Sequence, residues 1–327
     1  MVMLISVIVP AYNAEKYIDN CIESIYKDAP NNSAFEVIVI NDGSLDKTAE
    51  KISNLRIKYG NITQIDLENS GVSVARNIGI NRAKGKYVLF LDADDELIDG
   101  SFSKLCSFLS NYEQIDMLVT RQVRRRDGAD RIVPAPPLAE GIRYTGVEAF
   151  ALGFVRTNAG GGICLTSFLR NNYIFFPEGV KNSEDTVFFG LVQVYARSIV
   201  YYNLSLYCIN EVEGSASRVD SSHIGLNLID TLKSVATIRN GLKCPPEQKG
   251  VFEYITYQLL SNTISWFAVS KDLNYHKLRT LIDLKCLLPL EIKNMKMMKA
   301  KSSLLNNSFM LFYFLSWIQG KLQKFII

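Results

Sequence analysis

Tyr87-Val88-Leu89-Phe90-Leu91-Asp92-Ala93-Asp94-Asp95 is the most informative stretch of this 327-residue sequence. Its first five residues are apolar or aromatic, which is typical of a central strand that is buried on both faces. Three carboxylates follow directly, and such a cluster at the end of a buried strand is costly unless a cation lies near it. Because ligands of open α/β sheets bind at the carboxyl ends of strands, we expect a metal ion here, held together with the phosphates of a ligand.

A simpler interpretation is that these carboxylates cap a helix. Asp92, Asp94 and Asp95 would then lie at the start of a helix that begins at about Glu96. Capping explains one aspartate well but does not explain three. We therefore favour the metal site.

The composition describes a folded protein with a substantial core. Of its residues 48% are hydrophobic and 21% are charged, and the length allows one large domain or two smaller ones. A formal net charge of only +3 does not favour a binder of nucleic acid or another polyanion. The six cysteines are scattered without a CxxC pair, so neither a zinc site nor a disulfide framework is predicted, which fits a reducing cytosol.

The apolar start of the chain is predicted to be a strand. It lacks a basic leader and is broken by Pro10, which argues against a signal peptide. The sequence has no run of about 18 apolar residues, and therefore no transmembrane helix is predicted.

Strands and helices alternate through the first ninety residues, at a spacing typical of a parallel, doubly wound sheet. The strands are predicted at 4–9, 35–40, 62–67 and 87–91, and the helices between them at 17–25, 46–57 and 72–83. Pro10 lacks an N–H group and predicts the end of the first strand. Asn13 suits the N-cap of the helix that follows, and Gly85 suits a C-cap turn before the central strand.

This alternation places polar side chains at the carboxyl ends of three strands of one sheet, namely Tyr12, Asp42 and Asp92. Asp42 can accept N–H donors from a nucleobase, and Tyr12 offers a flat ring against which a base can lie. Arg76, one turn into its helix, can reach a carboxylate or a diphosphate with its planar guanidinium. The alternative for Arg76 is a surface ion pair.

Four motifs in this order resemble glycosyltransferase family 2. They are Ser6–Asn13, Val39–Ser44, Gly71–Asn77 and Leu91–Asp94. Together they span most of the first hundred residues, which makes the resemblance specific, whereas a lone DxD motif would be weak. The resemblance implies an α/β chain of GT-A type with a doubly wound, mostly parallel sheet, and the sequence pattern predicts a smaller α-helical C-terminal region after it. It also implies transfer of a sugar with inversion at the anomeric carbon.

The resemblance also implies roles for individual residues. Asp94 would be the direct ligand of Mg²⁺ or Mn²⁺, and Asp92 would lie near the ribose and the metal. Arg76 would lie near the base or the phosphates. The residues predicted to bind the nucleotide sugar are Pro10, Tyr12, Asn13, Asp42, Gly71, Arg76, Asp92 and Ala93.

Glu184 and Asp185 form a second acidic site. Ser183 can cap a helix that begins at Glu184, and ordinary charge compensation at a helix N-terminus would explain both acids. The resemblance implies instead that they are the acidic pair of the family. Asp185 would be the general base that takes the proton of the acceptor hydroxyl, and Glu184 would lie on the acceptor side.

Two segments between these sites have open interpretations. Asp127-Gly128 predicts a hairpin tip, and the arginines of 124–126 beside it are predicted to be solvated, with contact to an acidic or phosphorylated acceptor as the alternative. Residues 158–162 include three consecutive glycines and are predicted to be mobile. They form either a loop that closes over the substrate or a plain linker.

The segment after residue 198 departs from the family pattern. Residues 199–202 and 204–209 predict a strand pair. The resemblance predicts an arginine-containing segment before Gly214-Ser215, but this chain has Tyr207-Cys208-Ile209-Asn210. The missing arginine would have contacted the phosphates of the donor, and Arg218 is the substitute that we consider for it.

The C-terminal part is predicted to be helical. We expect a catalytic domain over 1–221, with a nucleotide-binding half at 1–100 and an acceptor-binding half at 101–221, and a helical region over 222–327. Residues 285–327 are rich in lysine and contain an apolar run at Phe309–Ile318. This run suits a helix at a membrane surface, or one packed on the catalytic domain or a second subunit.

The expected function is inverting, metal-dependent transfer of a sugar from a nucleotide-diphosphate sugar. Uridine is the default base, and a hydroxyl of a glycan or lipid-linked saccharide is the acceptor. We expect this reaction in surface polysaccharide biosynthesis, in the cytoplasm or at the cytoplasmic face of the membrane.

Two other functions share parts of this pattern. A sugar-1-phosphate nucleotidyltransferase would need a glycine-rich phosphate loop with a basic residue after the first strand, and residues 10–13 do not supply one. A non-catalytic nucleotide-binding scaffold would bind nucleotide without turnover. The presence of both Asp94 and Asp185 argues against the scaffold.

Overall fold

The computed structural model describes residues 3–29, 34–211 and 221–269, together with positions 278, 281, 287 and 288. The chain divides into two compact units. The first comprises Met1–Phe154, Asn158–Glu178 and Tyr195–Ser215, and the second comprises Val155–Thr157, Gly179–Val194 and Ala216–Ile327. The predicted domain boundary at residue 221 stays a prediction.

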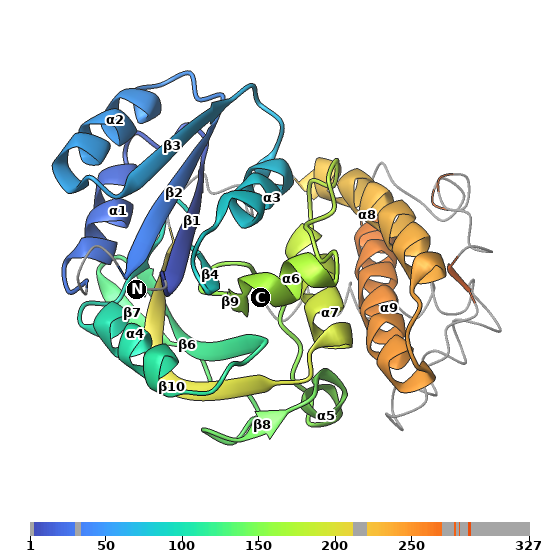
Figure 1. The fold of residues 1–327 in the computed structure, drawn as a ribbon. Coiled ribbons are helices and arrows are strands. Elements are labelled where there is room, and N and C mark those ends of the chain that lie inside the picture. The colour runs from blue at the N-terminus through green and yellow to red at the C-terminus, as the bar shows by residue number, and fades with distance from the viewer. Residues whose placement is uncertain are drawn as a thin grey trace. The chain divides into compact units, whose positions relative to one another are not determined.

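The first unit begins with four parallel strands in the order β3-β2-β1-β4. They are β1 (Ile5–Ala11), β2 (Phe35–Asp42), β3 (Ile62–Leu67) and β4 (Tyr87–Phe90). The helices α1 (Ile18–Tyr26) and α2 (Thr48–Tyr59) lie on one face of these strands, and α3 (Val72–Arg82) lies on the other (Figure 1). Because crossover connections are right-handed, the reversal of strand order after β3 places α3 on the opposite face. The predicted doubly wound α/β fold is confirmed.

Apolar sequence explains why these strands form the centre of the unit. Every residue of β1, β2 and β4 is buried, as expected for strands covered by helices on both faces. The helix α1 buries an apolar stripe that is formed by Ile18, Cys21, Ile22 and Ile25.

The sheet continues beyond β4 with mixed strand directions, in the order β4-β9-β6-β10-β5. Antiparallel β9 (Ile163–Leu165) joins β4 to β6 (Met117–Arg126), and β10 (Ile199–Asn210) pairs with β6 in parallel. The short strands β5 (Glu96–Leu97), β7 (Ala129–Ile132) and β8 (Arg143–Tyr144) complete the ten-stranded sheet. The helices α4 (Ser101–Asn111), α5 (Gly146–Ala151) and α6 (Thr166–Asn171) connect these strands.

The predicted strand pair at 199–209 is wrong, because β10 is one continuous strand. Its register with β6 shifts between Tyr201 and Tyr207, and these shifts accommodate the irregular sequence.

Two local predictions in the first loop are also wrong. Pro10 lies inside β1 and pairs with Ile40, although its missing N–H was expected to end the strand. The pairing between β1 and β4 stops at Ile8, so Pro10 needs no donor on that side. Asn13 is not the N-cap of α1, because that helix begins at Ile18 after Tyr17.

Gly85 has a different role from the predicted helix cap, since α3 is capped at Ala83. A Cβ atom at Gly85 would lie 2.4 Å from the backbone nitrogen of Ser6 and 2.5 Å from the carbonyl carbon of Ile5. Glycine is therefore required here because the chain passes directly against β1.

Replacing Gly85 with Ala is expected to lower the free energy of unfolding by about 2 kcal/mol, since the new methyl group must push two backbone segments apart. Gly250→Ala is a matched control, because a Cβ atom at Gly250 meets nothing within 4 Å. It should leave stability unchanged or raise it by up to about 1 kcal/mol, because alanine favours helix. Urea unfolding followed by circular dichroism would measure both variants, and equal effects would contradict this explanation.

The second unit is built from α7 (Glu184–Tyr195), α8 (Ser221–Gly241) and α9 (Pro246–Val269). α8 and α9 pack side by side (Figure 1). A Cβ atom at Gly190 of α7 would lie 2.5 Å from Ile255 of α9, so the missing side chain allows close helix packing. The buried Glu253 of α9 forms an ion pair with the half-buried Arg239 of α8, with Nε and Oε1 2.8 Å apart.

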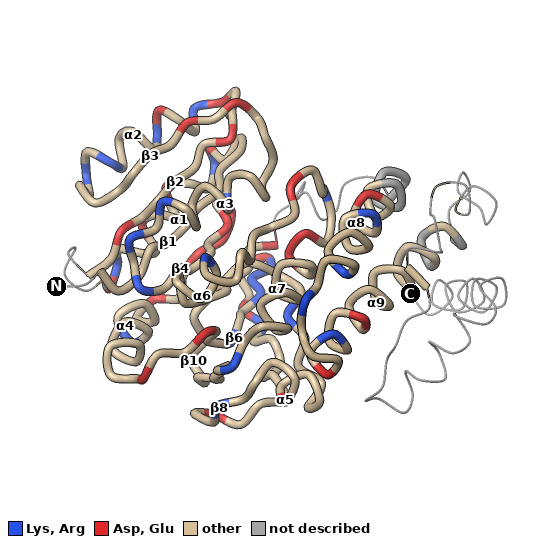
Figure 2. The backbone as a smooth tube through the Cα atoms, turned by 45° about the vertical axis from the view of Figure 1, so that its right-hand side comes forward, with Lys and Arg blue, Asp and Glu red and all other residues tan. Residues whose placement is uncertain are grey.

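Lys and Arg are interspersed with Asp and Glu along the described backbone (Figure 2), in keeping with the small net charge. Among the described helices, none is long and apolar enough to cross a membrane. The predicted surface run Phe309–Ile318, Gly214-Ser215 and Arg218 lie outside the described residues.

Candidate functional site

The acidic residues after β4 form a turn rather than the start of a helix. The backbone N–H of Asp95 donates to the carbonyl of Asp92 at 3.0 Å, and the chain then enters the short strand β5 at Glu96. The next helix, α4, begins only at Ser101. The helix-capping alternative for the three aspartates is therefore wrong.

Asp92 is paired with a buried arginine. Nη2 of Arg76 lies 2.8 Å from Oδ1 of Asp92, and the Arg76 side chain is only 5% exposed. The guanidinium also lies over the ring of Phe176, with 5.1 Å between its carbon and the ring centroid. The alternative of a surface ion pair is wrong, and Arg76 is held at the acidic turn from the first turns of α3.

Asp94 and Asp95 are in an environment that disfavours their charge. Burial, followed by the charge of Asp92, raises the pKa of Asp94 above its ordinary value. The same two causes raise the pKa of Asp95 to about 8. Within the described residues, the carboxylate of Asp94 forms no hydrogen bond or ion pair with another residue.

This arrangement fits a divalent cation held together with a ligand. Carboxylate oxygens are hard donors that suit Mg²⁺ and Mn²⁺, and a nearby cation would offset the cost of ionising Asp94. The described residues contain no cluster of three or more His, Cys, Asp or Glu side chains that could hold a metal ion. Mg²⁺ is usually bound by one or two carboxylates plus substrate phosphates, so a partial protein ligand set is what a phosphate-bridged ion needs.

We expect the metal-free protein to lose stability as the pH rises from about 4 to 8. Asp95 keeps its proton in the folded chain up to a pKa of about 8 but loses it near 3.8 in the unfolded chain. Its contribution is therefore fully present below the lower value and is lost as the pH approaches the upper one. Asp95→Asn removes this ionisation. The free energy of unfolding of the variant minus that of the wild type should therefore increase with pH, by up to about 1.4 kcal/mol per pH unit. Urea unfolding with a chelator across this pH range would test this, and a difference that does not change with pH would contradict it.

The end of β2 is tied to the start of α3 through Asp42. Its two carboxylate oxygens accept the backbone N–H groups of Ser70 and Gly71, at 2.7 and 2.9 Å. Gly71 has φ of 93°, a conformation that favours glycine. Each oxygen of Asp42 retains a lone pair, so the predicted contact with a nucleobase stays open as a prediction.

The loops after β1 and β2 are joined by Asn13. Its backbone N–H donates to Oγ of Ser44 at 3.0 Å, and its Oδ1 accepts the N–H of Leu45 at 2.9 Å. Asn13 adopts a left-handed conformation with φ of 50°, which asparagine tolerates. Tyr12 beside it is 49% exposed, so its ring is available to a ligand.

The first unit thus brings most of the predicted residues to one edge of the sheet. Pro10 lies near the end of β1, Tyr12 and Asn13 follow it, and Asp42 ends β2. Gly71 and Arg76 lie at the start of α3, and Asp92, Ala93 and Asp94 follow β4. Since β2, β1 and β4 are neighbours in the sheet, these groups share its carboxyl edge.

Glu184 and Asp185 belong to the second unit. They occupy the first turn of α7, which begins at Glu184 as predicted, and Val187 to Val194 are buried behind them. Ser183 before them has φ of 66° instead of the extended backbone of a usual N-cap. Thr231 of α8 donates to the carbonyl of Asn182 at 2.6 Å and so anchors this helix start. The role of Asp185 as general base stays a prediction.

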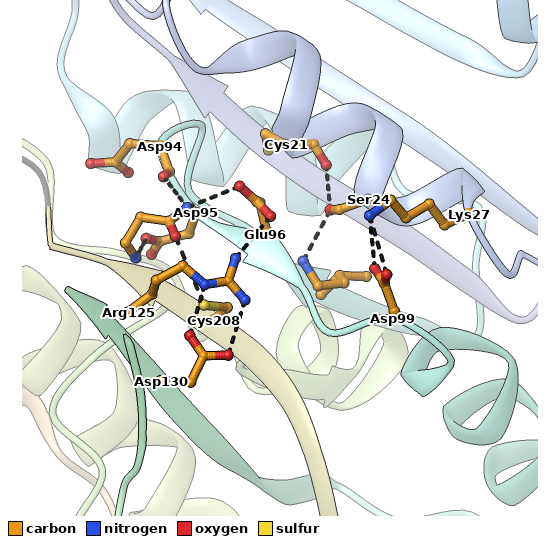
Figure 3. A network of polar contacts seen from close by, with 12 residues as sticks. Cys21, Ser24, Lys27, Asp94, Asp95, Glu96, Asp99, Arg125, Asp130 and Cys208 are labelled. Carbon is orange, nitrogen blue, oxygen red and sulfur yellow. Dashed lines mark hydrogen bonds and ion pairs between the residues drawn. The ribbon is translucent and has the colours of Figure 1, made fainter. Parts of the chain in front are cut away.

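The β6–β7 hairpin turns at Asp127-Gly128 as predicted, with φ values of 50° and 76°. Arg125 in this hairpin is more than a solvated charge. Its Nε and Nη2 bind both carboxylate oxygens of Asp130, at 2.7 and 3.1 Å, and its Nη1 lies 3.3 Å from Glu96 (Figure 3). Arg125 therefore links the hairpin to Glu96 of β5, the strand that follows the acidic turn.

Residues 159–162 are buried, Asn158 is half-buried, and the segment is held by specific hydrogen bonds, contrary to the predicted mobile loop. Gly161 donates to the carbonyl of Phe90 at 2.9 Å, and Phe90 donates to the carbonyl of Gly162 at 3.1 Å. Gln122 donates to the carbonyl of Gly160 at 2.7 Å. These glycines are needed for close contact with β4 and β10, rather than for mobility.

The sequence prediction missed the residues of β10 that contact the acidic turn. The hydroxyl of Tyr207 donates to Oδ2 of Asp95 at 2.6 Å, and the backbone N–H of Asn210 donates to Oδ1 at 2.8 Å. A buried tyrosine usually finds a partner for its hydroxyl. This rule applies to Tyr207 and equally to Tyr201 of the same strand, and it does not identify the partner of either.

Comparison with known proteins relates this chain to glycosyltransferases. The family model described as Glycosyl transferase family 2 matches residues 6–168. Poly(ribitol-phosphate) beta-N-acetylglucosaminyltransferase TarS of Staphylococcus aureus is 31% identical over 189 residues, which are 57% of this chain and 32% of that protein. The chain spans about a third of the length of the first curated relatives that it matches.

Solved structures show the same fold. The crystal structure of S. aureus TarS 1-349 in complex with UDP-GlcNAc matches with a TM-score of 0.61 at 25% identity, over 83% of this chain and 74% of that chain. The mannosyltransferase PcManGT from Pyrobaculum calidifontis, in complex with GDP-Man and Mn²⁺, matches with a TM-score of 0.53 over 98% of this chain and 87% of that chain. At 14% identity the second likeness concerns the fold alone.

Proposed function

Through residues 6–168 this chain belongs to glycosyl transferase family 2, with a GT-A fold, and we propose that it transfers a sugar from a nucleotide-diphosphate sugar to a hydroxyl group. The donor is a UDP-sugar, and the acceptor is a glycan or lipid-linked saccharide used to build a surface polysaccharide. The relative TarS, whose name states transfer of N-acetylglucosamine to poly(ribitol-phosphate) and whose structure holds UDP-GlcNAc, supports this choice.

The observation that carries the proposal is the carboxyl edge of β2, β1 and β4. This edge combines an exposed ring at Tyr12, a buried cation at Arg76 and a carboxylate at Asp94 without a protein partner among the described residues. A nucleotide sugar offers a flat base, which matches the aromatic ring. It also offers two phosphates, which match a guanidinium and a metal-binding acid.

Each residue has a stated task in this proposal. Tyr12 stacks on the base, Asp42 accepts its N–H groups, and Arg76 orients Asp92 next to the ribose and the diphosphate. Asp94, with Asp92 nearby, would hold Mg²⁺ or Mn²⁺, which would stabilise the charge that develops on the leaving diphosphate. Pro10, Asn13, Gly71 and Ala93 shape the site through their backbone positions.

Asp185 is the proposed general base. Its carboxylate takes the proton from the acceptor hydroxyl while the hydroxyl oxygen forms its bond to the anomeric carbon. The bond between that carbon and the diphosphate oxygen breaks, and the nucleoside diphosphate leaves with the electron pair. One such displacement inverts the anomeric configuration. Glu184 lies on the acceptor side in this proposal.

A screen of nucleotides tests the donor class without knowledge of the acceptor. UDP with Mn²⁺ should raise the melting temperature of the wild-type protein, because a ligand that binds only the folded state stabilises it by mass action. UDP with a chelator should have a smaller effect, and so should GDP, ADP and CDP with Mn²⁺. If none of these nucleotides stabilises the protein in a metal-dependent way, the proposed function is wrong.

A further inference from the structure

We infer that Tyr207 and Asn210 of β10 are positioning residues that orient the acidic turn so that Asp94 alone is left for the cation. This inference rests on the proposed function and names residues that the family resemblance did not supply. The segment that contains them replaces the arginine-containing segment that the resemblance predicts.

Tyr207 connects the two ends of the acidic turn through one hydroxyl group. The side chain is fully buried, and its hydroxyl donates to Oδ2 of Asp95 at 2.6 Å. The hydroxyl oxygen of Tyr207 also accepts the backbone N–H of Asp92 at 3.3 Å. Because Asp92 and Asp95 are three residues apart, a single phenol fixes the curvature of the turn between them.

Asn210 holds the remainder of the turn. Its backbone N–H donates to Oδ1 of Asp95 at 2.8 Å, so both oxygens of that carboxylate are bound by β10. Its side-chain amide donates to the carbonyl of Asp94 at 3.0 Å and to Oε1 of Glu96 at 3.3 Å. The peptide of Asp94 is thereby fixed while its carboxylate receives no contact from β10.

The consequence is a division of tasks among three neighbouring acids. Asp92 is bound by Arg76, and Asp95 is bound by Tyr207 and Asn210. Figure 3 shows the carboxylate of Asp94 directed away from the side chain of Asp95 and from Arg125. Asp95 is thus an anchor of the turn, and Asp94 is the acid that remains available to a ligand.

Two glycines hold Tyr207 in place. A Cβ atom at Gly160 would lie 2.3 Å from the Tyr207 hydroxyl, and one at Gly161 would lie 2.9 Å from the Tyr207 Cβ. The backbone of the segment therefore rests directly on the tyrosine, and its hydrogen bonds to β4 prevent it from moving aside. A ring confined in this way can serve as a fixed support for a metal ligand.

Tyr207→Phe tests the inference because it removes only the hydroxyl group. We expect the affinity for Mn²⁺, measured by calorimetry in the presence of saturating UDP, to fall by about tenfold or more. In sugar transfer, the KM for the donor should rise while the KM for the acceptor stays unchanged. Tyr201→Phe is the matched control, since Tyr201 is also buried in β10 but donates to Asn203, away from the acidic turn.

The outcomes separate this inference from the proposed function. Wild-type protein that binds no nucleoside diphosphate with Mn²⁺ would overturn both. If the wild type binds and Tyr207→Phe binds Mn²⁺ as tightly as Tyr201→Phe, only the positioning role is overturned.

If Tyr207→Phe does not fold, Asn210→Ala decides the question, because it removes the side-chain bonds to Asp94 and Glu96 but keeps the backbone bond to Asp95. The same loss of Mn²⁺ affinity is expected for it, and wild-type affinity would overturn the inference.

Discussion

Replacing Asp185 with Asn is expected to lower kcat for sugar transfer by about 10³-fold, because the amide cannot accept the proton of the acceptor hydroxyl. The variant should fold normally, since Asp185 lies in the first turn of α7 and the buried face of that helix begins behind it. Loss of one charge at a helix N-terminus costs only about 0.3–1 kcal/mol. Steady-state kinetics with a UDP-sugar and an acceptor saccharide would measure the effect.

The control for Asp185 is an acid in the same kind of position. Glu247 occupies the first turn of α9, so Glu247→Gln removes a comparable interaction with a helix N-terminus. It should leave kcat within about twofold of the wild type, since it changes stability only through the helix terminus. Equal losses in the two variants would mean that Asp185 acts on stability rather than on chemistry. Unchanged kcat in Asp185→Asn would exclude it as the general base.

Replacing Asp94 with Ala is expected to lower kcat/KM for the donor by about 10³-fold. The reason is electrostatic, because the diphosphate would lose the cation that Asp94 is proposed to hold. Folding should be preserved or improved in the absence of metal, because burial and the charge of Asp92 raise the pKa of Asp94 and so make its ionised form costly. Initial rates over a range of donor and Mn²⁺ concentrations would measure the loss.

Asp99→Asn is the corresponding control. Asp99 follows the same strand region, but its side chain is 72% exposed and pairs with Lys27 at the surface. Surface ion pairs contribute about 0–1 kcal/mol, so this variant should retain full activity. An Asp94→Ala enzyme that is as active as Asp99→Asn at every metal concentration would remove Asp94 from the site.

The sequence was sufficient for features that depend on local patterns. Runs of apolar residues such as Tyr87–Leu91 predict the buried strands, because a strand covered on both faces needs little polar surface. The alternation of strands and helices predicts the parallel sheet, and the sheet topology then brings Tyr12, Asp42 and Asp92 to one edge. The hairpin at Asp127-Gly128 follows from its turn residues alone.

The features that the sequence did not predict depend on contacts between distant residues. Three glycines in a row suggest mobility when read locally, but Gly160 and Gly161 are buried against Tyr207 of a later strand. Asn13 has the composition of an N-cap, yet its partners are Ser44 and Leu45 in the loop after β2. Pro10 can remain in β1 only because the neighbouring pairing with β4 has already ended.

The central claim is that Asp94 and Asp185 act on the same reaction by different means, one through the donor and its metal and the other through the acceptor. Calorimetric titration of UDP into wild type, Asp94→Ala and Asp185→Asn, each with Mn²⁺ and with a chelator, tests this claim most directly. We predict metal-dependent UDP binding in the wild type and in Asp185→Asn, and its loss in Asp94→Ala. Metal-dependent binding that survives in Asp94→Ala, or that is lost in Asp185→Asn, would contradict the account.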